Sequence, residues 1–175
     1  MSNSPTTLPP DDSRRQLTLA NGERDSSLPH IGMAGDTYTI TISGKDTAGQ
    51  FCIMDIHIPH GGGPPHRHNF EETFIVLEGE VEASVRGQKT RVRRGDTVNI
   101  PANAPHQFRN VSPESARLLC ICSPSGQEEF FVELGVSVAT RTTPPPELDH
   151  AQQLEFIQKA KALAPRYKTE FLDEA

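Results

Sequence analysis

The sequence is poor in cysteine, and it has neither a long apolar run nor an excess of basic residues. Its three cysteines, an odd number without framework spacing, argue against a disulfide-stapled secreted protein. No apolar run approaches the roughly 18 residues that a membrane span needs, and the residues after Met1 lack the basic and apolar regions of a signal peptide. The formal net charge of −6 argues against nucleic acid or an anionic membrane as the main partner. We therefore expect a soluble, cytoplasmic protein with no nucleic-acid or membrane partner.

The chain of 175 residues is long enough for one domain with appendages. Residues 1–27 are rich in Ser, Pro, Asp and Thr and show little periodicity, so we expect a flexible arm. Residues 28–140 alternate short strand-like runs with turn signals, which indicates a barrel domain. Residues 141–175 begin with a proline-rich linker and continue with a helical pattern.

Short segments rich in β-branched and aromatic residues recur about every 8 to 12 residues, which predicts an antiparallel sandwich or barrel. In the segment 51–58, four alternating apolar residues predict a buried face, opposite Asp55 and His57 on a polar face. Cys120 and Cys122 share one face of another segment, where we expect a buried, inert pair. The expected strands are residues 37–42, 51–58, 81–85, 89–94, 98–100, 106–111 and 117–122.

The period changes from two to helical spacing after residue 124. Ser125 and Glu128 have the spacing of a capping box and predict the start of a short helix. A second helix is expected from about residue 147 to 164, ended by Pro165. We expect this helix to pack on the outside of the barrel, and docking of a partner is the alternative. Its apolar stripe consists of Leu154, Ile157, Ala160 and Leu163.

The stretch 64–79 contains the residues with the clearest chemistry. If it is extended, alternate side chains share a face, so His66, His68 and Glu72 project to one side. Phe74 and Val76 follow on that side. Two imidazoles and a carboxylate among apolar residues are costly to bury unless a cation lies between them. This pattern predicts a site for a divalent metal ion.

Two spaced patterns extend this prediction. The first reads His-x-His-x3-Glu-x6-Gly and begins at His66, and the second reads Gly-x5-Pro-x4-His-x3-Asn and begins at Gly95. Together they resemble the paired signature of the cupin superfamily, in particular the small one-domain, quercetin dioxygenase-like cupins. His60 stands where the first pattern of the family usually has a glycine, and Asn103 replaces the second glycine of the second pattern. Asparagine tolerates a positive φ, so the latter change is mild.

The resemblance implies an all-β fold, an antiparallel jelly-roll (double-stranded β-helix) barrel, to which the predicted C-terminal α-helix is added. It also implies that His66, His68, Glu72 and His106 bind one metal ion, and that the protein forms a homodimer. This ligand set suits Fe, Mn, Ni, Cu or Zn. The alternative for any single histidine is a hydrogen-bonded residue of the core.

A substrate pocket is expected beside the metal. Phe108 lies two residues from His106 and should face inward, whereas Arg109 should face away. An apolar pocket favours an aromatic or otherwise apolar substrate over a sugar phosphate. The predicted pocket consists of Phe74, Val76, Val98, Ile100 and Phe108.

Three functions fit these residues. The first is a metal-dependent, dioxygenase-like oxidoreductase, in which Glu72 binds the metal and accepts the proton of a substrate hydroxyl. The second is a metal-dependent isomerase or lyase of a small polar acid or sugar, and the third is a non-enzymatic binding or sensor protein. Glu71 should point away from the site, solvated or paired with Arg67.

Overall fold

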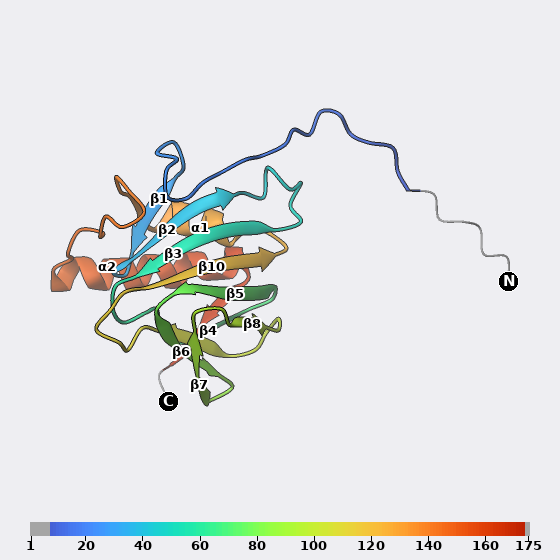
Figure 1. The fold of residues 1–175 in the computed structure, drawn as a ribbon. Coiled ribbons are helices and arrows are strands. Elements are labelled where there is room, and N and C mark those ends of the chain that lie inside the picture. Colours follow the sequence, from blue (N-terminus) through green and yellow to red (C-terminus); the bar gives the residue numbers. More distant parts are fainter. Residues whose placement is uncertain (1–7, 174–175) are drawn as a thin grey trace, which may run out of the picture.

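Two antiparallel sheets make up the body of the molecule, in a computed structural model that describes residues 8–173 (Figure 1). The larger sheet has the strand order β11-β1-β2-β3-β10-β5-β8, and the smaller one β12-β4-β9-β6-β7. The predicted all-β jelly-roll with a C-terminal helix is confirmed. In chain order the elements are β1 (His30–Met33), β2 (Asp36–Ile42), β3 (Cys52–Ile58), β4 (His66–His68), β5 (Glu71–Glu78), β6 (Glu80–Val85), β7 (Gln88–Arg93), β8 (Thr97–Ile100), β9 (His106–Arg109), β10 (Ala116–Ser123), α1 (Gln127–Leu134), β11 (Val136–Ser137), α2 (His150–Leu163), η1 (Ala164–Tyr167) and β12 (Thr169–Phe171).

The register of the larger sheet places its inward-facing residues in rows. Glu72 of β5 lies opposite Cys122 of β10, which in turn lies opposite Cys52 of β3. Directly paired residues share a face of the sheet, so each row contributes to the interior. The predicted apolar face of residues 52–58 is confirmed, because all four of its members are buried. The row next to Glu72 consists of Phe74, Cys120 and Met54.

The sequence suggested a single strand for the stretch that begins at His66, but the structure has two strands there. It forms β4 and β5, which belong to different sheets, and the chain crosses between the sheets at residues 69–70. Backbone partners from distant segments hold this crossing. The N–H of Asn69 donates to the carbonyl of Lys168 at 3.1 Å, and the N–H of Asn103 donates to the carbonyl of His68 at 2.7 Å. Asn103 adopts a φ of 67°, as expected for a residue in the place of a glycine.

The short strands β1, β11 and β12 were not predicted. β12 pairs with β4 along its whole length, and Arg67 forms an ion pair with Glu170 across this edge. The C-terminal segment is therefore the outer neighbour of the strand that carries His66 and His68. The predicted arm, residues 1–27, and the predicted tail, residues 141–175, extend beyond the described residues, and residues 8–29 contain no helix or strand.

The two helices are present, but their caps differ from the prediction. The N-cap of α1 is Gly126, without a side-chain cap, so the predicted capping box is wrong. The Glu128 carboxylate instead accepts hydrogen bonds from the N–H groups of Gly44 at 2.7 Å and Gly126 at 2.8 Å. The capping box of this tail lies on α2, between Asp149 and Gln152.

Helix α2 runs behind the strands in the view of Figure 1. Only the C-terminal half of its predicted apolar stripe is covered: Ala160 is buried, whereas Leu154 and Ile157 are 49% and 48% exposed. The packing prediction is therefore right for the last turns of the helix and wrong for its first turns. No helix in residues 8–173 is long and apolar enough to cross a membrane.

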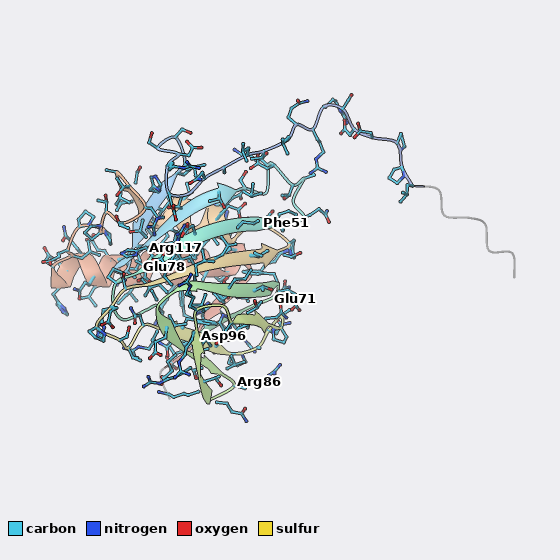
Figure 2. The ribbon with its side chains drawn as sticks, in the orientation of Figure 1. Phe51, Glu71, Glu78, Arg86, Asp96 and Arg117 are labelled. Carbon is cyan, nitrogen blue, oxygen red and sulfur yellow. The ribbon has the colours of Figure 1, made fainter. Side chains whose placement is uncertain are left out.

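Asp55 is buried, with 3% of its surface exposed, although the sequence placed it on a polar face. The Arg117 guanidinium donates to both of its carboxylate oxygens, at 3.0 Å and 2.6 Å. Arg117 also pairs with Glu23 and with Glu78 at 3.3 Å, and Figure 2 shows Arg117 and Glu78 side by side on β10 and β5. These hydrogen bonds, with Asp55 first, raise the pKa of Arg117.

Asp36 is a second buried carboxyl, and it makes stability depend on pH. Its Oδ1 atom has no hydrogen-bond partner among residues 8–173, and burial raises its pKa from 3.8 to about 7. The folded protein therefore binds more protons than the unfolded chain between about pH 4 and 7, so the free energy of unfolding falls as the pH rises through this range. We expect Asp36→Asn to remove this slope and to stabilise the protein at pH 8 more than at pH 5, measured by urea unfolding. An equal effect of the substitution at both pH values would contradict this assignment.

Candidate metal centre

Four side chains from three strands converge inside the molecule. His66 and His68 come from β4, Glu72 from β5 and His106 from β9. Their ligand atoms lie within 4.8 Å of one another, so the group could hold a metal ion. The pairing of β4 with β9 sets His66 directly opposite His106. Glu72 Oε2 lies 3.1 Å from Nε2 of both His68 and His106. The structure thus brings together all four residues that the sequence singled out as ligands.

The second nitrogen of each imidazole fixes the tautomer. In all three rings, Nδ1 lies between 2.8 and 3.0 Å from a backbone carbonyl oxygen two residues away. A carbonyl oxygen can only accept a hydrogen bond, so Nδ1 carries the hydrogen. A neutral ring then presents the lone pair of Nε2 to the centre, which is the atom that a metal needs. The pairs are His66 with Pro64, His68 with Phe70, and His106 with Ala104.

The carboxylate and the imidazole lone pairs of this cluster repel one another unless a cation lies between them. With hydrogens on Nδ1, the Nε2 lone pairs of His68 and His106 face a carboxylate oxygen, and all three residues are buried. Burial alone would raise the pKa of Glu72, but when His106 and His68 also carry a proton on Nε2, their hydrogen bonds to Oε2 outweigh burial and hold this pKa well below its ordinary value. The carboxylate is therefore ionised, and its repulsion of the lone pairs is relieved only by added protons or by a metal ion.

Protonation of the imidazoles relieves this repulsion only in part. Burial, together with the nearby His106, lowers the pKa of His66 to about 4. Burial also acts to lower the pKa of His106, but the hydrogen bond and the charge of Glu72 raise it overall. At neutral pH, His66 therefore remains neutral and offers its lone pair. Three imidazole nitrogens and one carboxylate oxygen fit a divalent transition metal such as Fe, Mn, Ni, Cu or Zn.

The predicted pocket residues do not all lie in the same surroundings. Phe74, Val76 and Ile100 are buried, and the Phe74 and Phe108 rings lie 4.2 Å apart in the interior. Val98 lines a cavity of about 390 Å3, whose other walls sequence reasoning missed. The alternation of apolar residues in 81–85 was the signal that could have found part of them. The cavity is lined by Ala83, Val85, Arg86, Gln88, Thr90, Val92 and Val98.

This cavity adjoins the candidate metal centre. Val85 on its wall pairs directly with His106 across β6 and β9, and Ala83 pairs with Phe108. Paired residues share a face of the sheet, so the cavity wall continues into the strand that carries the fourth ligand. Two residues of the cavity wall thus lie opposite residues of β9, although none of the four candidate ligands is part of the wall.

Glu71, the neighbour of Glu72, points away from the centre, as expected. Its carboxylate accepts hydrogen bonds from Asn99 Nδ2 at 2.8 Å and from the N–H of Ala102 at 3.1 Å. The suggested pairing with Arg67 is wrong, because Arg67 is held by a residue of β12. Two adjacent glutamates thus have separate surroundings, one buried among imidazoles and the other exposed.

Known proteins resemble this chain in sequence and in fold. Residues 49–122 match the family model described as a cupin domain. Quercetin 2,3-dioxygenase of Bacillus subtilis is 32% identical over 120 residues, which cover 67% of this chain and 34% of that protein. The chain spans between 34% and 65% of the length of eight curated relatives that it matches.

Two solved structures support the fold alone. An RmlC-like cupin from Shewanella frigidimarina has 18% sequence identity and a TM-score of 0.51, and the match covers 65% of this chain and 99% of that chain. KdgF from Halomonas sp. has 19% identity and a TM-score of 0.50, with 57% and 89% covered.

Proposed function

Since this chain contains a small cupin domain, which the family model matches over residues 49–122, we propose that it is a metal-dependent, dioxygenase-like oxidoreductase acting on a small aromatic or otherwise apolar molecule. The observation that carries the proposal is the cluster of three imidazoles and the Glu72 carboxylate, whose ligand atoms lie within 4.8 Å of one another while each Nδ1 donates to a carbonyl. His66, His68, Glu72 and His106 would hold one Fe, Mn, Ni, Cu or Zn ion.

The bound ion would supply a Lewis acid and, if it is redox-active, an electron relay between substrate and oxygen. Four protein ligands leave one or two positions open for substrate or water. The chain itself would supply the base: the Glu72 carboxylate lies among the ligand atoms, where it would accept the proton of a substrate hydroxyl. The stacked ring of Phe70, 3.8 Å from that of His68, would help to exclude water and to fix the imidazole.

The surroundings support an apolar substrate. The interior beside the ligands holds Phe74 and Phe108, and the adjoining cavity of about 390 Å3 is within the range of small-molecule sites. Arg86 is the one charged residue of its wall, while Gln88 and Thr90 can orient a substrate hydroxyl. The similar protein from Bacillus subtilis is named for quercetin, which agrees with a phenolic substrate.

A homodimer also belongs to this proposal. The outer face of the larger sheet carries half-buried apolar side chains on three neighbouring strands. In particular, Ile75 pairs with Leu119, and Ile121 pairs with Ile53. A second copy would cover this face, as isologous interfaces do.

Oxygen uptake by the metal-free full chain, reconstituted with Fe, Mn, Ni, Cu or Zn one at a time, tests the proposal. With a panel of phenols as substrates, we expect uptake with at least one redox-active ion and none with the Glu72→Gln variant. No uptake with any ion would overturn the oxidoreductase. Turnover of a small polar acid or sugar without oxygen would establish a metal-dependent isomerase or lyase instead, and tight binding without product would establish a sensor.

A further inference from the structure

The two oxygens of the Glu72 carboxylate have different surroundings. Oε2 faces the imidazoles of His68 and His106 at 3.1 Å. Oε1 faces two thiols instead, with Cys120 Sγ at 3.3 Å and Cys122 Sγ at 3.9 Å. The two sulfur atoms lie 3.6 Å apart, and both residues are almost completely buried. The function proposed above gives these two thiols no role.

The pairing of β10 with β5 explains how the thiols reach the carboxylate. Cys122 lies directly opposite Glu72, and Cys120 lies opposite Phe74, one row further along. Residues two apart in a strand share a face, so both thiols point into the interior behind the carboxylate. They approach Glu72 from the strand on one side, while the imidazoles approach from the other sheet.

Each thiol has one hydrogen, and the distances favour one donation pattern that links both sulfur atoms to the carboxylate. Cys122 donates its S–H to Cys120 Sγ, and Cys120 donates its own S–H to Glu72 Oε1. The distance of 3.3 Å is a good hydrogen-bond length for a sulfur donor, whereas 3.9 Å is long, which favours this order. Rotation of the carboxylate to turn both oxygens toward the imidazoles would break the bond from Cys120 and leave a buried donor unpaired, which is costly.

We propose that Cys120, supported by Cys122, is a positioning residue that holds Glu72 as a one-oxygen metal ligand. Its hydrogen bond occupies Oε1 and leaves Oε2 for the ion, so a second coordination position stays open for substrate. The inference rests on the proposed metal function. It differs from the inert pair that the sequence suggested, because the thiols contact a ligand directly.

The rival explanation is a second ion, because Glu72, Cys120 and Cys122 also place three donor atoms within 4.8 Å of one another. In that case the thiols would lose their hydrogens and bind metal themselves, with Glu72 between two ions. The positioning role predicts instead one ion per chain and no bond between sulfur and metal. Cobalt(II) distinguishes the two, because a bound thiolate gives it an intense charge-transfer absorption.

The test uses cobalt(II) with the full chain, and it compares wild type with Cys120→Val, Cys120→Ala and Cys120→Ser. We expect both apolar variants to bind cobalt about tenfold more weakly, at the lower end of what the loss of a ligand's hydrogen-bond partner costs. Their ligand-field spectra should change as Glu72 becomes free to turn. Cys120→Ser keeps a donor at this position and should restore both the affinity and the spectrum of wild type.

Cys52→Ala is the matched control, because Cys52 is equally buried and lies beside Cys122, but has no hydrogen bond to Glu72 among the described residues. It should leave cobalt binding unchanged. If both apolar variants keep the affinity and spectrum of wild type, the positioning role is overturned but the metal centre is not. A thiolate-to-cobalt absorption in wild type would have the same consequence. Wild-type protein that binds no cobalt would overturn the metal centre itself, and the role of Cys120 with it.

Discussion

Glu72→Gln is expected to weaken metal binding by at least about a hundredfold, more than the loss of a partner of a ligand costs. The carboxylate is the one anionic donor of the cluster, and the amide that replaces it is neutral. The three imidazoles remain, so the variant should keep its fold while the centre loses its charge. Metal content per chain after dialysis, with a titration of the apo-protein, measures the effect.

Glu71→Gln provides a control of the same chemistry one residue away. Figure 2 shows Glu71 at the end of β5, and its carboxylate bonds to Asn99 and to the backbone of Ala102, away from the imidazoles. Its metal content should equal that of wild type. If both variants bind metal as wild type does, the four converging side chains are not a metal site, and if both lose it equally, general charge rather than ligation attracts the ion.

Arg117→Met is expected to lower the free energy of unfolding by about 3–5 kcal/mol, the cost of leaving a buried partner charge unpaired. Asp55 is buried beneath the guanidinium and has no comparable partner among its other hydrogen bonds in the described chain. Methionine retains most of the volume of the arginine stem, so the effect reports the charge rather than a cavity. Urea unfolding of the two proteins at pH 7 measures it.

The double variant Asp55→Asn with Arg117→Met should recover part of this loss, because the uncompensated charge is gone. Arg91→Met is the surface control: Arg91 pairs with Glu80 at 2.7 Å but its side chain is 59% exposed, so we expect a change within about 1 kcal/mol. A similar loss for the two single arginine variants would show that burial of Asp55 does not set the cost.

Three members of the candidate metal centre, His66, His68 and Glu72, could be predicted from local spacing, whereas His106 was implied by the resemblance to the cupin family. Glu72 lies four residues after His68, and the interval from Gly95 to His106 fixes where β9 begins after β8. Yet alternation along a single strand does not describe this stretch, because the chain changes sheets at residues 69–70. Which sheet a strand joins is decided by backbone partners, and for β4 these are β9 and β12, remote in sequence.

Asp55 illustrates what local pattern cannot provide. Alternation gives its direction correctly, away from the apolar face, but the segment around Gly22 and Glu23 covers that side of the sheet. A Cβ atom on Gly22 would lie 2.8 Å from Asp55 Oδ2, so the close approach of this backbone depends on a residue without a side chain. Coverage by a segment with no regular structure leaves no periodic signal in the sequence.

The edge between β12 and β4 has a consequence for when the proposed metal centre would form during synthesis. His68 is paired with Thr169, so the strand that presents two of the imidazoles must wait for about a hundred further residues to leave the ribosome before its outer neighbour exists. A nascent chain that already carries all four donors would hold β4 by its pairing with β9 alone, without the outer neighbour β12. On the proposed metal function, we therefore expect stable metal binding only after residue 171 has emerged and β12 has paired with β4.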